Sequence, residues 1–386
     1  MARVIYITAD GERRELEYSQ DVAKPSFDMS KDELYISLHR AFESATIPIL
    51  YDKNISSIKP RVDRLDLDNL PSDTRAIFFT SGTTGEPTGA LKSEENISKE
   101  LEVLKNLFAP YNFERVIVTV PLIHIYGYLA GVMLPKALNA DVILKEEFIP
   151  HELLNLAEEK RTLCITNPVF LKVLNKLKID GNYSNITFLS STGKLDADIA
   201  KSLCEKIGCK IYQLFGSTET GGIAYKIDDE ELWRPLSGVE IKAVDKKLSV
   251  ESDYISDYII ESELQKLDKP FLTTDIIEIV DDSFRLLGRE SEIIKISGKR
   301  ISILEVESLL EQSRLIDEVL VKLSYSVDSH KDEQLALSIV SSIELVELKK
   351  EVREILRKNY KNINIKTTIK QVEKIAKTHT GKKIRR

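Results

Sequence analysis

Short apolar runs alternate with amphipathic helical patterns through the middle of the chain. The runs predicted to be buried strands are residues 76–79, 116–120, 142–144, 163–165, 186–189 and 211–215. Between the first two, Ile97, Leu101, Leu104 and Phe108 recur on one face of a predicted helix. This alternation predicts an α/β sheet with helices on both faces, in which ligands bind beyond the carboxyl ends of the strands.

The pattern divides the chain into four expected parts. They are a shortened N-terminal segment at 1–73, an α/β core at 74–237, a small β subdomain at 238–288 and a small, mobile α+β C-terminal domain at 289–386. The first part is polar and irregular apart from a helix expected over 34–45. Strands in the β subdomain are expected at 239–244, 248–250, 258–260, 276–280 and 284–287. In the last part, helices are expected at 303–311 and 345–358, and strands at 318–323 and 334–340.

Composition narrows the class of protein. The 386 residues exceed the size of one ordinary core, and 42 % hydrophobic with 30 % charged residues is typical of a globular protein. A net charge of −7 without a basic block before the C-terminal end argues against a nucleic-acid partner. Cys164, Cys204 and Cys209 lack ligand-like spacing and are expected to be reduced thiols. No signal-like start and no apolar run near ~20 residues predict a cytoplasmic protein without membrane-spanning helices.

The most informative segment is residues 80–89, Thr-Ser-Gly-Thr-Thr-Gly-Glu-Pro-Thr-Gly, which we call the Thr/Gly loop. Small residues let backbone N–H groups turn around an anion, and hydroxyl groups add donors, so a strand entering this loop predicts a phosphate site. The loop has neither the spacing of the usual NTPase loop nor the Gly-x-Gly-x-x-Gly pattern of dinucleotide-binding proteins. The alternative interpretation is a flexible turn without a ligand. The candidate phosphate-binding residues are Thr80, Ser81, Gly82, Thr83, Thr84 and Gly85.

Other polar segments also follow predicted strands. They are Pro-Leu-Ile-His-Ile-Tyr-Gly at 121–127, Ser-Ser-Thr-Gly-Lys-Leu at 190–195, Gln-Leu-Phe-Gly-Ser-Thr-Glu-Thr-Gly at 213–221, Phe-Leu-Thr-Thr-Asp at 271–275 and Leu-Leu-Gly-Arg at 286–289. The chain closes on Lys-Thr-His-Thr-Gly-Lys-Lys-Ile-Arg-Arg at 377–386. Taken singly, each has a plainer interpretation, such as a loop carrying a solvated Glu or a basic tail.

Taken in order, these motifs resemble those of the AMP-forming acyl-activating (adenylate-forming) enzymes. That superfamily includes acyl-CoA synthetases, aryl-CoA ligases, nonribosomal adenylation domains and luciferase. The resemblance covers residues 74–386, and Gly-Ser-Thr-Glu-Thr-Gly-Gly-Ile-Ala together with Phe-Arg-Leu-Leu-Gly-Arg looks especially like the compact acyl-CoA synthetases and aryl polyene-type AMP-ligases. The shortened N-terminal segment is then expected to be a remnant of the usual N-terminal subdomain.

The resemblance implies a nucleotide site. The Thr/Gly loop would bind the ATP phosphates, Thr218 the α-phosphate, and Glu219 a Mg²⁺ ion. The residues implied to lie against adenine are Thr192, Gly193, Phe215 and Gly216, with Phe215 in the place of the usual Tyr. Asp275 would accept hydrogen bonds from the ribose hydroxyls, and Arg289 would contact ribose and phosphate.

The same resemblance implies the reacting groups. His124 would contact the substrate carboxylate, and Lys382 would be the catalytic lysine that neutralises charge on carboxylate and α-phosphate. Ser291 falls on the hinge, and Gly298 on the glycine that lets a pantetheine arm pass.

Three departures from the family pattern stand out. Thr88 replaces the Lys that usually follows Pro in the first loop; Lys92 or another base is expected to supply that charge, and otherwise a lower ATP affinity is expected. Thr274 replaces the Gly before Asp275, and Ser291 replaces an Asp or Lys at the hinge.

The implied function is ATP-dependent activation of an aryl or fatty acid, followed by transfer to CoA or to a 4′-phosphopantetheine carrier protein. The first alternative is an adenylate-forming enzyme that acylates a protein or stops at acyl-AMP. The second is a non-catalytic nucleotide-binding relative. A partner chain, or a second copy in a homodimer, is the hypothesis for completing the acid pocket.

Overall fold

The computed structural model describes residues 2–17, 29–44, 46–55, 57–80, 87–157, 160–296, 299–326, 329–360, 365–377 and 383. Ser81, Gly82, Thr83, Thr84 and Gly85 lie outside these ranges, as do Gly298 and Lys382. The chain forms two compact units. The first comprises Met1–Lys242, Ser249–Leu272 and Val280–Phe284, and the second Ala243–Leu248, Thr273–Ile279 and Arg285–Arg386.

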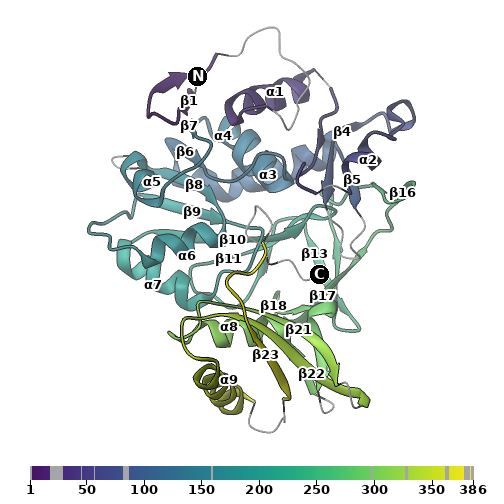
Figure 1. Ribbon diagram of the computed structural model, residues 1–386. Helices are drawn as coiled ribbons and strands as arrows, with labels where there is room; N and C mark the ends of the chain where they lie inside the picture. Colours follow the sequence, from purple (N-terminus) through teal and green to yellow (C-terminus); the bar gives the residue numbers. More distant parts are fainter. Residues whose placement is uncertain are drawn as a thin grey trace. The chain divides into compact units, whose positions relative to one another are not determined.

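A nine-stranded sheet organises the first unit, in the order β12-β11-β10-β9-β8-β6-β7-β1-β2 (Figure 1). Its strands are β1 (Val4–Ile7), β2 (Arg13–Glu15), β6 (Arg115–Val118), β7 (Asp141–Leu144), β8 (Thr162–Thr166), β9 (Ile186–Ser190), β10 (Lys210–Ser217), β11 (Gly221–Ile227) and β12 (Arg234–Pro235). The strands from β1 to β10 in this order pair in parallel, and β2, β11 and β12 join antiparallel. Five of the six predicted strands are therefore confirmed in this sheet. The run at 76–79 is instead part of β4 (Thr74–Thr80), which lies in a separate sheet and pairs antiparallel with β5 (Thr88–Ser93).

Helices cover both faces of this sheet. The helices of the unit are α1 (Lys31–Glu43), α2 (Lys59–Val62), α3 (Glu94–Phe108), α4 (Leu134–Leu138), α5 (Pro150–Ala157), α6 (Pro168–Lys176) and α7 (Ala197–Ile207), with 3₁₀ turns η1 (Leu67–Asn69) and η2 (Ala109–Tyr111) and the π-helix η3 (Gly127–Met133). On one face, Ile211 packs in a core with residues of α5, α6 and α7. The next residue, Tyr212, points to the opposite face and meets Phe108 of α3 edge-to-face at 5.1 Å.

The N-terminal segment differs from its prediction. It was expected to be irregular apart from one helix, yet β1 pairs in parallel with β7 and becomes part of the sheet. The run Val4-Ile5-Tyr6-Ile7 is only four residues long and is followed by the polar strand β2, so its strand character was missed even though Asp10-Gly11 lies in the turn between the two strands. The expected helix is present as α1, three residues earlier at its start.

A five-stranded sheet, β16-β15-β5-β4-β3, contains the two ends of the Thr/Gly loop, in β4 and β5. Its strands are β3 (Ile49–Leu50), β4 (Thr74–Thr80), β5 (Thr88–Ser93), β15 (Tyr258–Ile260) and β16 (Leu264–Lys266). The strand at 258–260 was expected in the β subdomain but pairs with β5. Local sequence cannot specify which of two sheets an isolated three-residue strand joins, because that choice is made by long-range pairing.

A four-stranded sheet, β13-β14-β17-β18, accounts for the other expected β-subdomain strands. These are β13 (Glu240–Val244), β14 (Lys247–Glu251), β17 (Phe271–Val280) and β18 (Ser283–Arg289). The predicted subdomain limits at 238 and 288 stay a prediction.

The C-terminal part of the second unit is α+β. Its elements are η4 (Glu290–Glu292), β19 (Ile293–Ile296), β20 (Lys299–Ser302), α8 (Ile303–Glu311), β21 (Glu318–Ser326), β22 (Ser329–Val340), α9 (Leu345–Asn359) and β23 (Thr367–Gln371). The predicted helices and strands are present, and β23, which was not predicted, pairs in parallel with β22. Its sequence, Thr-Thr-Ile-Lys-Gln, has one large apolar residue and therefore gave no strand pattern.

Candidate functional site

The ends of the Thr/Gly loop are held together by β4 and β5. Thr80 pairs with Thr88 across this antiparallel hairpin, and Phe79 pairs with Gly89. A Cβ on Gly89 would lie 2.7 Å from Cζ of Phe79, so only glycine fits opposite that ring. The two ends of the loop are therefore fixed at adjacent positions, as expected for a loop that encloses an anion.

A second turn, residues 216–222, joins β10 to β11, and we call it the Thr-Glu turn. Ser217 N donates to Thr220 Oγ1 at 3.0 Å, and Thr220 N donates to Ser217 Oγ at 3.2 Å. These reciprocal bonds close the turn across Thr218 and Glu219, whose side chains are only partly buried. The turn thus presents one hydroxyl and one carboxylate at the carboxyl end of β10.

Phe215 lies just before the Thr-Glu turn in an aromatic cluster. Its half-buried ring is 5.4 Å from the ring of Trp233 and 5.9 Å from that of Phe284. A Cβ on Gly216 would lie 2.1 Å from the carbonyl oxygen of Gly221, so glycine is required there. The cluster gives Phe215 a fixed position from which an exposed part of the ring can contact a planar ligand.

The segment after β9 lies beside the end of β10. Ser191 Oγ donates to the carbonyl oxygen of Leu214 at 2.9 Å. Thr192 has φ +73°, in a region that a β-branched residue rarely adopts, and both Thr192 and Gly193 are exposed. Such strained backbone persists where the surroundings enforce it, often at ligand sites.

His124 stands between β6 and the π-helix η3. Its carbonyl oxygen accepts from Tyr128 N at 2.8 Å, and its side chain is partly buried. Tyr126 Oη donates to the carbonyl oxygens of Thr166 and Leu189, at the ends of β8 and β9. These bonds hold the start of η3 at the carboxyl edge of the parallel strands. The sequence did not predict a π-helix, a form that often occurs at functional sites.

In the second unit, the structure brings Asp275 and Arg289 together. Arg289 Nε donates to Asp275 Oδ1 at 3.3 Å, and Asp275 is 8 % exposed. The backbone N–H of Asp275 donates to Thr273 Oγ1 at 3.1 Å, which fixes the backbone that carries the carboxylate. The two residues that the resemblance assigned to ribose are therefore direct neighbours.

The hinge segment begins immediately after Arg289. Ser291 lies in the 3₁₀ turn η4, and Arg289 N donates to Glu292 Oε2 at 3.2 Å across it. Gly298, the predicted thiol-channel residue, lies outside the described residues.

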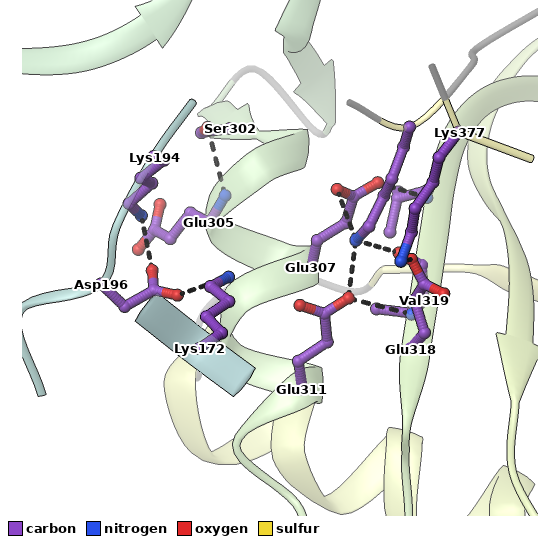
Figure 2. Close-up of polar contacts among 12 residues, drawn as sticks. Lys172, Lys194, Asp196, Ser302, Glu305, Glu307, Glu311, Glu318, Val319 and Lys377 are labelled. Carbon is purple, nitrogen blue, oxygen red and sulfur yellow. Dashed lines mark hydrogen bonds and ion pairs between the residues drawn. The ribbon is translucent and has the colours of Figure 1, made fainter. Parts of the chain in front are cut away.

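Lys382 lies outside the described residues, but both sides of its segment are anchored. Lys377 and Lys383 form an antiparallel bridge. Lys383 Nζ donates to Glu311 Oε1 and to the carbonyl oxygen of Val319, both at 2.6 Å, and to Glu307 Oε2 at 3.3 Å. Lys377 Nζ is 2.7 Å from Glu318 Oε1. Figure 2 shows these acidic side chains on α8 and β21, with Lys377 beside Glu318.

Lys92 does not take the place of the missing loop lysine. Its side chain is 1 % exposed, and Nζ donates to the carbonyl oxygens of Glu219 at 3.0 Å and Tyr254 at 2.6 Å. The ammonium therefore binds backbone carbonyls inside the protein. The expectation that Lys92 supplies charge to the Thr/Gly loop is wrong, because the sequence did not reveal that this side chain is buried. Sequence reasoning assigned Lys92 a different role and missed its neighbour Glu100. Glu100 falls three residues after Ile97 and four before Leu104, so a charge on the apolar face of α3 was the available clue.

The donor set fits a Mg²⁺ ion that arrives with a nucleotide. Within the described ranges, no group of three or more His, Cys, Asp or Glu side chains is arranged to hold a metal ion. Mg²⁺ commonly binds through one or two carboxylates, substrate phosphates and waters. Glu219, the carboxylate on the Thr-Glu turn, meets that requirement.

One cavity of about 260 Å³ lies elsewhere in the first unit. Its lining residues are Ile5, Ile7, Arg13, Arg115, Ile143, Asn155 and Leu156. None of them is a predicted site residue, and the cavity lies at the β1–β7 side of the sheet. We assign it no role in the chemistry.

The fold and these motifs together define an AMP-binding enzyme. The family model described as "AMP-binding enzyme" matches residues 4–252, and the chain belongs to this family.

Its relatives carry ligase names. The chain is 27 % identical over 338 residues to the medium-chain fatty-acid–CoA ligase of Escherichia coli K12, covering 80 % of this chain and 59 % of the relative. It is 26 % identical over 340 residues to the putative long chain fatty acid-CoA ligase VraA of Staphylococcus aureus COL, covering 83 % and 71 %. The chain therefore spans about three fifths of the length of the E. coli relative.

Solved structures share the fold. ATP-bound MatB from Rhodopseudomonas palustris superposes with a TM-score of 0.74 at 16 % identity, over 99 % of this chain and 94 % of that one. The o-succinylbenzoate CoA synthetase MenE of Bacillus subtilis, in complex with the acyl-adenylate OSB-AMP, gives 0.74 at 17 % identity, over 92 % and 85 %. These likenesses confirm the predicted fold class.

Proposed function

We propose that this chain is an ATP-dependent acid–thiol ligase, which activates a carboxylic acid as an acyl-adenylate and transfers the acyl group to a pantetheine thiol. Membership of the AMP-binding enzymes supports this, and one contact carries it. Lys92 Nζ, on the strand that leaves the Thr/Gly loop, bonds to the carbonyl oxygen of Glu219, 127 residues away. The two segments that resemble phosphate and metal motifs are thus joined in one compact unit.

In the first step, a carboxylate oxygen bonds to the α-phosphorus of ATP, and the bond from that phosphorus to the bridging oxygen breaks. Pyrophosphate leaves with the electron pair. Residues 80–85 cradle the phosphates, Thr218 donates to the α-phosphate, and Lys382 neutralises the developing charge. Glu219 holds the Mg²⁺ ion, which when bound offsets the negative charge of the phosphates.

In the second step, a thiolate sulfur attacks the acyl carbon, the carbon–oxygen bond to phosphate breaks, and AMP leaves. The thiol proton passes to solvent. We propose that the C-terminal domain, residues 289–386, reorients about Ser291 between the two steps, and that Gly298 leaves room for the pantetheine arm.

The remaining site residues bind and orient the substrates. Asp275 and Arg289 hold ribose, and His124 contacts the acid carboxylate. The adenine contacts are proposed for Thr192, Gly193, Phe215 and Gly216. A medium-chain fatty acid is the leading substrate class, because the E. coli relative is named for that activity. Aryl acids are the second class to test.

We also propose a cytoplasmic location and two kinds of protein partner. Among the residues that the structure describes, no helix combines the length and apolar character needed to cross a membrane. Cys164, Cys204 and Cys209 are free thiols, which supports a cytoplasmic location. An acyl carrier protein as acceptor and a homodimer that completes the acid pocket are proposed as well.

The test is pyrophosphate release with ATP, Mg²⁺ and a panel of fatty and aryl acids, followed by mass spectrometry of thioesters formed with CoA or a pantetheine-loaded carrier protein. We expect release with one class of acid and a thioester with one of these acceptors. Lys382→Ala should abolish release, whereas Lys374→Ala, an exposed lysine of the same segment, should not. Release without a thioester on either acceptor would instead indicate an enzyme that stops at acyl-AMP or acylates a protein.

A further inference from the structure

Lys92 is buried at a position where a hydrophobic residue would be expected. It lies in β5, whose neighbouring residues Ala90 and Leu91 are buried as well, and it ranks among the largest fully buried side chains of the described chain. Lysine is almost never fully buried unless its charge is paired, because removing an ammonium from water costs several kcal/mol. Its burial therefore needs a specific reason.

The ammonium of Lys92 binds backbone rather than a single counter-ion. Nζ donates to the carbonyl oxygens of Glu219 and Tyr254. The carbonyl of Glu219 also accepts from Ser256 N at 2.8 Å. Lys92 thus ties the strand that leaves the Thr/Gly loop to the Thr-Glu turn and to the segment around residue 254.

Glu100 holds the other side of the same turn. It is 4 % exposed, and its Oε1 accepts from Gly222 N at 2.7 Å. Gly221 has φ +69°, and a Cβ there would lie 2.4 Å from Glu100 Oε2. Gly221 and Gly222 therefore make room for this buried carboxylate.

The two charges also stabilise one another. Burial lowers the pKa of Lys92 to about 8, and the Glu100 and Glu219 carboxylates oppose that shift. Burial raises the pKa of Glu100, and Lys92 and the Gly222 amide oppose it. A buried pair of this kind is often no more stabilising than well-packed apolar residues, so stability alone does not explain it.

What distinguishes this pair is where its hydrogen bonds end. Lys92 holds the carbonyl of Glu219, and Glu100 holds the amide of Gly222, three residues later. The backbone that follows the candidate metal-binding carboxylate is therefore fixed from within the core at two points, the carbonyl of Glu219 and the amide of Gly222. Groups that orient a ligand in this way are commonly worth 10- to 100-fold in metal affinity or activity.

We propose that Lys92 and Glu100 are positioning residues, which fix the backbone of the Thr-Glu turn so that Glu219 is preorganised for the divalent cation that accompanies ATP. This inference rests on the proposed function. It assigns to these two side chains a role in metal-nucleotide binding without any contact between them and the substrate.

The first experiment compares wild type, Lys92→Met and the matched control Lys99→Met, an exposed lysine on α3. Binding of Mn²⁺ in the presence of ATP is followed by the loss of the electron paramagnetic resonance signal of free Mn²⁺. We expect Lys92→Met to weaken Mn²⁺·ATP binding roughly tenfold or more, and Lys99→Met to match wild type. In pyrophosphate release, the Mg²⁺ requirement should rise while the KM for the acid stays unchanged.

The second experiment separates positioning from simple loss of stability. Glu100→Gln keeps an acceptor for Gly222 N–H and removes the negative charge that Lys92→Met leaves buried. The double variant should therefore recover thermal stability relative to Lys92→Met. Its Mn²⁺·ATP binding should stay weak, because the bond to the Glu219 carbonyl is still missing.

These two experiments have outcomes that support the proposal and outcomes that overturn it. Weak Mn²⁺·ATP binding that persists in the stable double variant supports it, as does faster amide hydrogen exchange at residues 217–222 in Lys92→Met. Wild-type affinity in Lys92→Met overturns it, and so does full recovery of affinity in the double variant. If wild type binds Mn²⁺·ATP but releases no pyrophosphate with any acid, the proposed function fails while this binding comparison still decides the positioning role.

Discussion

Two lysine-anchored segments carry the candidate catalytic groups, and they are held in different ways. The Thr-Glu turn is fixed at its own backbone by Lys92, which is 1 % exposed, and by Glu100. In the segment that contains Lys382, the described flanking residues Lys377 and Lys383 bind acidic residues of α8 and β21. The side chains of Lys377 and Lys383 are 40 % and 17 % exposed.

The two ways of anchoring match the different catalytic roles proposed for the two segments. A metal-binding carboxylate is most effective when it is held still before the reaction, because no reorganisation is then needed as charge develops. The catalytic lysine is proposed to act in one step and withdraw in the next, which suits anchors at the flanks of its segment. The two segments also belong to different compact units.

The largest effect is expected at the tip of the Thr-Glu turn. Glu219→Gln keeps the size of the side chain but removes the charge proposed to hold Mg²⁺. Pyrophosphate release should fall on the order of 10²- to 10³-fold. Glu240→Gln, at an exposed position of β13, should stay within twofold of wild type. Equal losses in both variants would remove Glu219 from the metal site.

A smaller effect is expected at the anchor beside Lys382. Lys383→Met removes three hydrogen bonds and leaves Glu307, whose side chain is 5 % exposed, without this cation. We expect pyrophosphate release to fall roughly tenfold, less than the 10²-fold that a misplacement of about 1 Å can cost. Lys377→Met breaks a more exposed ion pair and should change the rate less than twofold. If Lys377→Met were the more damaging variant, the anchor would have been assigned to the wrong lysine.

Replacing Thr88 by the lysine usual in the family should have a modest effect on the KM for ATP. Thr88 begins β5 opposite Thr80, so Thr88→Lys adds a positive charge at the end of the Thr/Gly loop. Because a partly exposed charge pair contributes about 1 kcal/mol or less, the KM for ATP should fall two- to fivefold. Thr88→Met supplies a long side chain without charge and should not lower it. A fall with both variants would point to packing rather than to phosphate binding.

The smallest effect is a pH dependence of stability. The pKa of Lys92 is about 8 in the folded protein and 10.5 as a free side chain. Between these values the unfolded chain binds the extra proton, so this group makes the free energy of unfolding rise with pH, by at most about 1.4 kcal/mol per pH unit. The charged groups that act on Lys92 are Glu100, Glu219, Lys269 and Asp257.

Lys92→Met should therefore lack part of the rise that wild type shows between pH 8 and 10, as measured by urea unfolding. Lys31 offers a comparison, since burial lowers its pKa to about 8 as well and its Nζ donates to the carbonyl oxygen of Val118 at 2.8 Å. Lys31→Met should lose a similar part of the rise but leave Mn²⁺·ATP binding unchanged. Parallel pH curves for wild type and Lys92→Met would show that Lys92 does not titrate in this range.

The sequence was a good guide wherever a pattern was local. Five of the six buried apolar runs are strands of the parallel sheet, and the Thr-Glu turn and the segment of His124 follow two of them, as the sequence predicted. The sequence was a poor guide where pairing between distant segments determines which sheet a strand joins. The strand β1 joins β7, and β15 joins β5, through contacts that no local pattern specifies.

The same limit explains the residues that were missed at the site. Lys92 was interpreted as a stand-in for a loop lysine, because only a fold can show which way a strand side chain points. The group that accepts its hydrogen bond, the carbonyl oxygen of Glu219, lies 127 residues away. Because every residue has a backbone carbonyl, the sequence cannot identify this acceptor.

The most direct test of the central claim is acid-dependent exchange of labelled pyrophosphate into ATP, measured without any thiol acceptor. Because the first step is reversible and needs no acceptor, we predict exchange with one class of carboxylic acid, its loss in Lys382→Ala and Glu219→Gln, and its retention in Lys374→Ala. Absence of exchange with every acid tested, in wild-type protein that binds ATP, would contradict the account and identify a nucleotide-binding relative that does not form adenylates.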